Sequence, residues 1–298
     1  MQAVKKYLSL IKFSHTIFAL PFALIGFSLG WQTIQRQITA EISELTWSFW
    51  ALKFSLVLLC MVFARSAAMA FNRFLDRKYD AQNHRTANRE IPSGLVKANH
   101  ALVFTIVMSF LFICCTYFIN TLCFYLSFVA IFVVLFYSYT KRFTALCHLL
   151  LGLGLSLAPI GAYLAITGTF DWVPVLFSLT VLFWVSGFDI IYSLQDEEFD
   201  RSVKLHSIPV SFGKKNALLL SVLLHVFCAL SLLTAGVLAA FGWWFWIGTA
   251  GFCGMLIYQH MLVKPSDLSK VNIAFMTANG LASIVLSFFV IIDIILHS

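Results

Sequence analysis

Long runs of apolar residues, each about the length of one membrane crossing, alternate with polar segments along this chain. A helix needs ~20 mostly apolar residues to cross the hydrocarbon core of a bilayer. The runs lack the apolar–polar alternation of outer-membrane β-strands, so helices are the predicted spanning elements. The sequence predicts an all-α, polytopic membrane protein with nine transmembrane helices, at residues 14–34, 47–71, 101–119, 121–140, 145–167, 173–192, 217–238, 241–262 and 272–296.

Composition excludes several other classes of protein. Of the 298 residues, 60% are hydrophobic and only 11% are charged, against roughly a quarter charged in soluble domains. A soluble enzyme, a disordered chain and a secreted disulfide scaffold are therefore excluded. The seven cysteines lie mostly within apolar runs and form no Cys-x-x-Cys pair, which indicates packing residues. No small-x-small cleavage site follows the first run, so we interpret it as a helix rather than a signal peptide.

The distribution of basic residues predicts the orientation of the helices. Seventeen of the 20 Lys and Arg residues lie at the N-terminus or in the loops after the second, fourth, sixth and eighth helices. The other loops contain only Arg36. Because basic loops stay in the cytoplasm, we expect a cytoplasmic N-terminus, cytoplasmic loops at 72–100 and 193–216, and a C-terminus outside. The net charge of +7 thus reflects topology and contact with membrane lipid, and we predict no nucleic-acid partner.

Acidic residues gather where two predicted helices reach the cytoplasmic side. Seven of the 13 acidic residues fall in two short stretches, 72–80 and 189–200. Asp189 lies inside the sixth apolar run, where a charge is costly and indicates a functional site. Solvation of a helix end explains one such cluster easily. Two clusters with the same Asp-x₃-Asp spacing indicate a shared site.

Helical spacing selects which residues of each stretch face the same way. Asn72, Asp76 and Asp80 are four residues apart and form one stripe, and Arg65 lies on it seven residues earlier. If the sixth helix continues through residue 200, four residues form a second stripe on one face of it, and Glu198 lies on the opposite face. The second stripe consists of Asp189, Tyr192, Asp196 and Asp200.

Two facing pairs of carboxylates fit Mg²⁺, which prefers hard oxygen ligands and bridges protein carboxylates to substrate phosphates. The predicted metal ligands are Asp76, Asp80, Asp196 and Asp200. No His-x₃-His or Cys/His cluster in the sequence indicates zinc instead. Nearby basic residues fit a metal-bound polyanion, most simply a diphosphate. The predicted diphosphate-binding residues are Asn72, Arg73, Arg85, Lys141, Arg142 and Lys204.

The two motifs also indicate an internal relationship. Asp76 and Asp196 are 120 residues apart, as are Asp80 and Asp200. Each pair ends an outside-to-inside helix and precedes a loop that ends in Ile-Pro. We therefore expect a single integral-membrane domain over residues 1–298, with parallel four-helix repeats at 14–140 and 145–262 and a ninth helix appended. This arrangement places the two motifs face to face across a central cavity.

These motifs resemble those of the UbiA-type intramembrane aromatic prenyltransferases. Asn72-x₃-Asp76-x₃-Asp80 matches the first motif of that family, and Asp189-x₂-Tyr192-x₃-Asp196-x₃-Asp200 matches the second. The segment 85–94 and the basic pair Lys141-Arg142 are also typical, and the resemblance covers nearly the whole chain. It implies that Mg²⁺ binds a polyprenyl diphosphate and that the prenyl chain moves to a ring carbon of an aromatic acid, in quinone biosynthesis at a bacterial inner membrane.

The resemblance and the positions of the residues together suggest roles for individual side chains. The expected catalytic residues are Asp189, Tyr192 and Arg142: Asp189 orients or deprotonates the phenol or serves as a third metal ligand, Tyr192 offers an aromatic face to the allylic cation, and Arg142 neutralises the leaving group. Asp189 and Arg65 are the candidate contacts to the aromatic acid. Arg65 would bind its carboxylate, or else pair with Asp189 and hold two helices together. His15 and His148 are weaker candidates for a base, since a lone His near a membrane interface usually makes a structural hydrogen bond.

The sequence leaves an alternative open for the acceptor and another for the class of protein. The chain most resembles members that act on 4-hydroxybenzoate, but Lys12–Pro21 is closer to a subgroup that prenylates 1,4-dihydroxy-6-naphthoate for menaquinone. Haem farnesylation and lipid-ether synthesis are further possibilities within the family. A membrane transporter is the alternative from another class, because intramembrane carboxylates also form ion pathways. Transporters usually place them near the midplane, whereas here they cluster at cytoplasmic helix ends.

Overall fold

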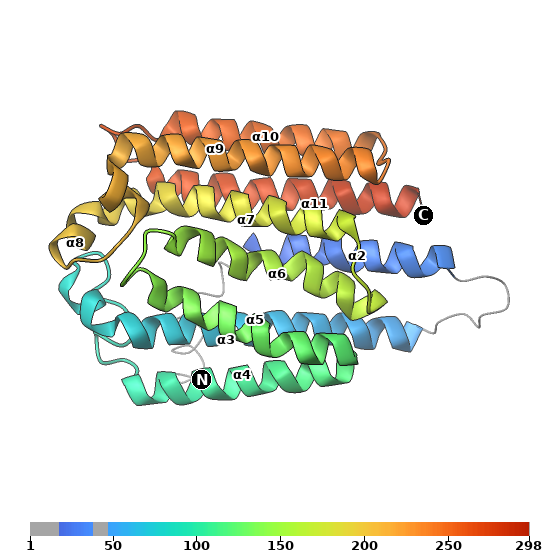
Figure 1. The fold of residues 1–298 in the computed structure, drawn as a ribbon, viewed down its shortest axis with the longest axis horizontal. Coiled ribbons are helices and arrows are strands. Elements are labelled where there is room, and N and C mark those ends of the chain that lie inside the picture. The colour runs from blue at the N-terminus through green and yellow to red at the C-terminus, as the bar shows by residue number, and fades with distance from the viewer. Residues whose placement is uncertain (1–17, 38–46, 298) are drawn as a thin grey trace.

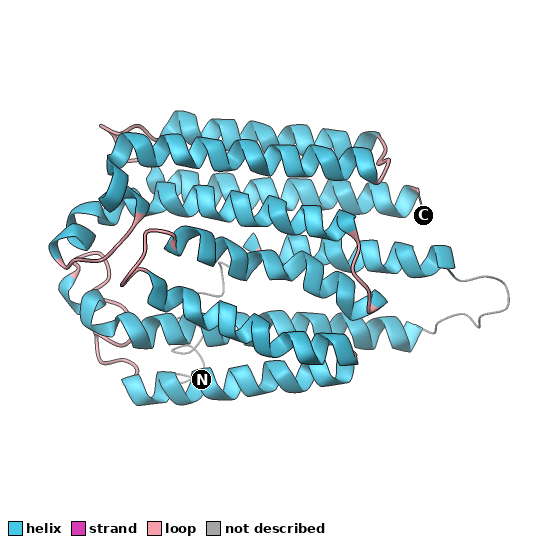
Figure 2. Cartoon of the chain, in the orientation of Figure 1, coloured by secondary structure: helices cyan, strands magenta, loops and turns pink. Residues whose placement is uncertain are grey.

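The computed structural model describes residues 18–37 and 47–297, and nearly every element in these ranges is helical (Figures 1 and 2). Among the described residues, nine helices contain 18 or more residues: α2 (Leu20–Gln37), α3 (Trp47–Gln82), α4 (Ala98–Ile119), α5 (Thr121–Thr140), α6 (Cys147–Thr167), α7 (Trp172–Ser193), α9 (Ile208–Leu238), α10 (Trp243–Leu262) and α11 (Asn279–Leu296). Shorter elements are the 3₁₀ turn η2 (Leu194–Asp196), the helix α8 (Glu197–Ser202) and the π-helix η3 (Ile273–Ala278). The prediction of an all-α protein is confirmed.

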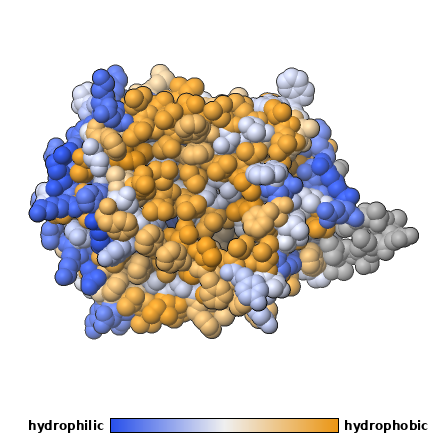
Figure 3. Space-filling view, viewed as in Figure 1, coloured by the Kyte–Doolittle hydropathy of each residue, from blue (hydrophilic) through white to orange (hydrophobic). Residues whose placement is uncertain are grey.

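Seven helical segments of the described chain are long and apolar enough to cross a membrane. They are Trp47–Gln82, Ala98–Ile119, Thr121–Thr140, Cys147–Thr167, Trp172–Ser202, Ile208–Leu238 and Ile273–Leu296. The helices α2 and α10 are not among them, so the predicted nine crossings are not confirmed. The surface supports a membrane setting: side chains along the helices are mostly hydrophobic, and hydrophilic ones gather at the two ends (Figure 3). The protein is an integral, multi-pass membrane protein.

Two helices extend beyond the apolar runs that predict them. α3 continues to Gln82, past the predicted end at residue 71, and so carries the whole first Asp motif on one helix. α9 begins at Ile208, before the predicted start at 217. The Ser207 side chain accepts a hydrogen bond from the Val210 N–H, and Pro209 occupies the first turn, which are typical features of a helix start. Gly213, with φ of 76°, then interrupts the helical geometry.

Close packing between neighbouring helices holds the site's walls in place. α7 packs against α6 and α9, and α6 packs against α2. The α2–α6 contact brings Gly26 against the backbone of Pro159, so close that a Cβ atom at residue 26 would lie 2.8 Å from the Pro159 carbonyl carbon. The largest buried side chain, Trp184 of α7, packs against Phe22 and Phe252. The division into two four-helix repeats remains a prediction.

Candidate active site

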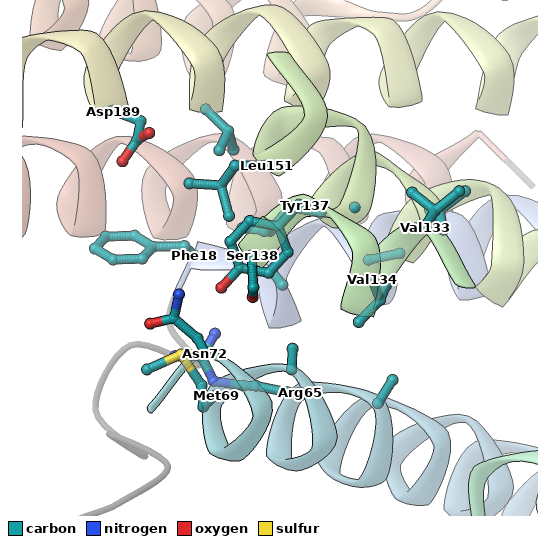
Figure 4. A pocket seen from close by; sticks show the side chains of 18 of the residues that line it. Phe18, Arg65, Met69, Asn72, Val133, Val134, Tyr137, Ser138, Leu151 and Asp189 are labelled. Carbon is teal, nitrogen blue, oxygen red and sulfur yellow. The ribbon is translucent and has the colours of Figure 1, made fainter. Parts of the chain in front are cut away.

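A large pocket of about 1100 Å³ opens among α3, α5, α6 and α7. Both Asp motifs line one part of it, together with the segment at residues 83–90 that follows α3. Apolar side chains such as Val133, Val134 and Leu157 line another part. Figure 4 shows Arg65 and Asn72 on one side of this pocket, Asp189 on the opposite side, and Tyr137 between them. A single space therefore offers both a charged and an apolar lining.

The first motif lies on the inward face of α3, as its spacing predicts. Asp76 and Asp80 are buried, with 2% and 5% of their surfaces exposed. Lys141 Nζ lies 3.0 Å from Asp76 Oδ2, and Arg142 Nη2 lies 2.9 Å from Asp76 Oδ1. Arg89 Nη1 lies 2.7 Å from Asp80 Oδ1. Because a buried carboxylate needs a counter-charge, these cations allow the motif to remain away from water.

The second motif is not carried by one continuous α-helix. The assumption that the sixth helix continues through residue 200 is therefore wrong. α7 ends at Ser193, the 3₁₀ turn η2 follows, and α8 begins at Glu197. A 3₁₀ turn rotates successive residues further than an α-helix does. The four residues of the stripe, Asp189, Tyr192, Asp196 and Asp200, nevertheless all line the pocket. Glu198 is exposed and lies outside the lining, so the selection within the motif agrees with the structure.

The segment after α3 connects the two motifs. Arg85 Nε donates to Asp196 Oδ1 at 2.9 Å, Arg85 Nη2 also contacts Asp196, and Arg85 Nη1 donates to the Tyr192 hydroxyl at 2.7 Å. Asn83 Nδ2 donates to Asp196 Oδ1 at 3.2 Å. Burial alone would lower the pKa of Arg85, but its hydrogen bonds to Asp196 raise it. The segment that follows the first motif thus supplies the cation that pairs with Asp196 of the second motif.

The other predicted diphosphate-binding residues divide into two groups. Asn72, Arg73 and Lys141 line the pocket. Burial alone would lower the pKa of Lys141, but the carboxylate of Asp76 raises it above the ordinary lysine value, with smaller contributions from Asp200 and Asp80. Arg142 is outside the lining and reaches the site only through Asp76.

Lys204 is the predicted residue that the structure does not bring to the site. It is exposed, its φ is 57°, and it lies outside the pocket lining. It follows the short helix α8, which carries Asp200. Lys204 is close to the second motif in the sequence, but the turn that follows the motif keeps its side chain outside the pocket.

The four aspartates fit a hard divalent cation in chemistry and placement. All four line one pocket, and Asp80 Oδ2 is buried without a hydrogen-bond partner, so an oxygen there is available to a ligand. In the arrangement observed, three of the four carboxylates are paired with Arg or Lys. Among the described residues, no group of three or more His, Cys, Asp and Glu side chains is close enough to hold a metal ion. Mg²⁺ needs no such group, because one or two carboxylates together with waters and substrate phosphates are enough to hold it.

The deeper part of the pocket contains the residues predicted to meet an aromatic acid. Arg65 and Asp189 both line it. The alternative partner for Arg65 was Asp189, but the Asp189 carboxylate lies 2.7 Å from His148 Nδ1. Tyr192, predicted to face the cation, lines the pocket, and so does Tyr137, whereas Tyr139 is exposed. His15 and the segment 12–17 lie outside the described residues.

Phe275 is a pocket residue that the sequence analysis missed. It lies on the π-helix η3, and its ring stacks on Tyr192 with centroids 4.2 Å apart. The Asn279 amide donates to the Ala274 and Phe275 carbonyls at 2.9 and 3.2 Å and accepts from Trp184 Nε1 at 2.8 Å. These bonds satisfy carbonyls that a π-helix leaves in unusual positions. An Asn inside the last apolar run was the only sequence signal for this irregularity.

The fold and the site together define an integral membrane protein with a pocket that two aspartate motifs line. The sequence pattern of the UbiA prenyltransferase family matches residues 19–281, and the chain belongs to that family. It is 32% identical to the 4-hydroxybenzoate octaprenyltransferase of Aliivibrio fischeri over 231 residues, which cover 76% of this chain and 78% of that protein. It is 30% identical to the enzyme of the same name from Nitrosomonas europaea, with 75% and 76% covered.

Solved structures agree with the fold. A UbiA homologue from Aeropyrum pernix superposes with a TM-score of 0.77 at 26% identity, covering 95% of this chain and 98% of that one. A homologue from Archaeoglobus fulgidus, bound to DMAPP and Mg²⁺, gives a TM-score of 0.69 at 20% identity, with 97% and 99% covered. The second likeness concerns the fold alone. The predicted resemblance to the family is confirmed.

Proposed function

We propose that this protein transfers a polyprenyl chain from polyprenyl diphosphate to a ring carbon of 4-hydroxybenzoate, in quinone biosynthesis. The observation that carries the proposal is one pocket that combines four aspartates, several Arg and Lys side chains and a deeper arginine, Arg65, with an apolar lining. The curated relatives named for this reaction support 4-hydroxybenzoate as the acceptor. Family membership favours prenyl transfer over the transporter alternative.

The diphosphate binds at the end of the pocket that carries the two motifs. Asp76, Asp80, Asp196 and Asp200 would hold Mg²⁺, and the ion would supply positive charge to offset the charge of the leaving diphosphate. Arg85 and Lys141 exchange part of their contact with the aspartates for contact with phosphate oxygens. Arg142, which lies outside the pocket lining, fixes Asp76, with Nη2 2.9 Å from Oδ1. The long prenyl chain lies along the apolar lining. No hydrogen bond has to be broken there, and the bound chain excludes water.

The acceptor binds deeper than the diphosphate. The planar guanidinium of Arg65 fits the carboxylate of the aromatic acid in a bidentate arrangement. Asp189, on the opposite side of the pocket, faces the phenol. The bond between prenyl C1 and the diphosphate oxygen breaks, and the aromatic faces of Tyr137 and Tyr192 stabilise the allylic cation. The ring carbon beside the phenol then attacks C1, in a space from which water is excluded.

The proposed orientation follows the distribution of basic residues. Both motifs and the segment 83–97 face the cytoplasm, as does the N-terminus, while the C-terminus is outside, and the membrane is a bacterial inner membrane. This places the site where a cytoplasmic aromatic acid and a membrane-held prenyl diphosphate can both reach it. All nine long helices cross the membrane in this proposal, with α2 and α10 as the two less apolar crossings.

The experiment that tests the function is an acceptor panel with purified protein. The protein is incubated in detergent or liposomes with Mg²⁺, a radiolabelled prenyl diphosphate and 4-hydroxybenzoate, 1,4-dihydroxy-6-naphthoate, haem or a glycerol-phosphate lipid precursor. We expect a prenylated product with 4-hydroxybenzoate at the highest kcat/KM. Preference for the naphthoate would support the menaquinone alternative. Absence of product with every acceptor would overturn the proposed reaction.

A further inference from the structure

His148, one of the most buried polar residues of the pocket, lies behind Asp189. It is the second residue of α6, only 3% of its surface is exposed, and it lines the pocket together with Asp189 of α7. The imidazole lies between the start of α6, residue Asp189 of α7 and the start of α9.

A glycine on α6 explains why the two side chains meet. A Cβ atom at Gly152 would lie 2.5 Å from the Leu182 carbonyl oxygen and would also collide with Ser186 Oγ. Since only hydrogen fits there, α6 and α7 approach with their backbones nearly touching. One turn further toward the motifs, residue 148 of α6 and residue 189 of α7 therefore face each other across a very short gap. A larger residue at 152 would separate them.

The two contacts of the imidazole identify its tautomer. The Ile208 backbone N–H can only donate, and it lies 3.4 Å from His148 Nε2, so Nε2 accepts. A neutral imidazole carries its proton on the other nitrogen. Nδ1–H therefore donates to Asp189 Oδ2, at 2.7 Å. His148 thus satisfies one of the unpaired N–H groups at the start of α9 and simultaneously holds one carboxylate oxygen of Asp189.

The other oxygen of Asp189 is left for the pocket. Asp189 keeps 22% of its side-chain surface exposed, and within residues 18–37 and 47–297 its Oδ1 makes no hydrogen bond. A carboxylate held at one oxygen presents the second in a fixed direction, which is how a partner residue orients a reacting group. Figure 4 shows Asp189 directed toward the space that separates it from Arg65 and Asn72.

We propose that His148 is a positioning residue for Asp189: its Nδ1–H fixes Oδ2 so that Oδ1 meets the phenol hydroxyl of the acceptor. This inference rests on the proposed function. The C1–O bond breaks first, with its electron pair remaining on the diphosphate. The phenol proton then passes to Asp189 Oδ1 as the ring carbon bonds to prenyl C1. When the ring regains aromaticity, its carbon releases a proton to the diphosphate, and Asp189 returns its proton to the phenol oxygen. Asp189 ends as it began.

Two substitutions separate this role from a purely structural one. Asn in place of His148 offers an amide N–H near the position of Nδ1 and so keeps the contact to Asp189, but it does not reach Ile208. Gln reaches the position of Nε2, where its oxygen can accept from the Ile208 N–H, but it no longer donates to Asp189. If His148 positions Asp189, His148→Asn should retain activity and His148→Gln should lose it. If His148 only caps α9, the order should reverse.

The kinetics should show the same distinction. We expect His148→Gln and His148→Leu to lower kcat with 4-hydroxybenzoate by about 10- to 100-fold, the usual loss when an orienting partner is removed. The KM for the prenyl diphosphate should stay within about threefold of wild type. His148→Asn should restore most of kcat. The deficit of His148→Gln should shrink with 3-fluoro-4-hydroxybenzoate, because a more acidic phenol depends less on a well-placed base.

A matched control lies on α9, outside the pocket lining. His225 of α9 is also buried and bonded, to His260 at 2.7 Å, but does not line the pocket. His225→Gln reports the effect of replacing a buried histidine as such, and thermal midpoints in detergent report folding. Equal kinetic loss in His148→Asn and His148→Leu would overturn the inference, as would a deficit independent of phenol acidity. Inactive wild-type protein would instead overturn the proposed function, before any variant is compared.

Discussion

The Arg85 guanidinium donates to the Asp196 carboxylate, with Nε 2.9 Å from Oδ1, although the two residues are 111 positions apart in the chain. Arg85 follows the first Asp motif and Asp196 belongs to the second. The same guanidinium bonds the Tyr192 hydroxyl at 2.7 Å and lies over the Tyr192 ring. One side chain from the segment that follows the first motif therefore holds two residues of the second motif, and it places a positive charge beside the Asp196 carboxylate.

Replacing Arg85 should weaken binding of the prenyl diphosphate. A hydrogen bond to a charged group contributes about 1.5–3 kcal/mol, so Arg85→Ala should raise the KM for the prenyl diphosphate by about 10- to 100-fold. The KM for the aromatic acid should change much less. Steady-state kinetics with each substrate varied in turn measure both values. Lys204→Ala, at an exposed basic residue outside the pocket, is the matched control and should behave as wild type.

Removing the metal or its carboxylates should abolish the reaction. We expect EDTA to stop prenyl transfer and Mg²⁺ to restore it, because hard oxygen ligands suit this ion. Asp76→Ala, Asp80→Ala, Asp196→Ala and Asp200→Ala should each lower turnover by ~10²-fold or more, as loss of a main electrostatic element does. Glu198→Ala provides the comparison, since Glu198 is exposed and outside the lining. A loss in Glu198→Ala equal to that in Asp196→Ala would contradict the assignment.

Arg65 should discriminate between the two substrates. Lys keeps the charge but loses the planar, bidentate geometry, so Arg65→Lys should raise the KM for 4-hydroxybenzoate more than that for the prenyl diphosphate. The variant should accumulate in the membrane as wild type does. Initial rates with each substrate varied provide the two KM values. Equal effects on both substrates, or failure to accumulate, would indicate that Arg65 only holds the helices together.

Adding one methyl group where α2 meets α6 should destabilise the protein. In Gly26→Ala the new Cβ would overlap the Pro159 backbone, which cannot rotate away, and overpacking of this kind costs typically about 1–3 kcal/mol. The thermal midpoint in detergent should fall. Gly254→Ala on α10 is the control, since its Cβ would have no neighbour within 4 Å, and Ala is the better helix former. An unchanged midpoint in Gly26→Ala would show that the two helices can separate without cost.

Cysteine labelling should test the orientation. Ser93 and Ser202 are exposed beside the two motifs, and Thr169 is exposed between α6 and α7. In intact cells, an impermeant thiol reagent should label a Thr169→Cys protein from outside, and Ser93→Cys and Ser202→Cys only after the membrane is opened. The background is a chain whose native cysteines are replaced. Labelling of Ser202→Cys from outside would reverse the topology and place the site on the other side of the membrane.

The sequence by itself determined the features that depend on composition and local spacing. An apolar run of about 20 residues must form a helix in lipid because its backbone groups have no other partner, so nearly every long helix could be located. Four-residue spacing placed Asn72, Asp76 and Asp80 on one face of a helix, and they line the pocket as predicted. Identity of the motifs also sufficed to predict the family.

Only the tertiary structure decided how segments far apart in the chain meet. No local rule predicts that α7 gives way to a 3₁₀ turn before Asp196, that the chain turns Lys204 away from the pocket, or that Asn279 supports a π-helix carrying Phe275. The pairing of His148 with Asp189 depends on the close α6–α7 approach at Gly152. Each of these features results from packing between helices, where the shape and hydrogen bonding of a distant neighbour outweigh the preferences of the segment itself.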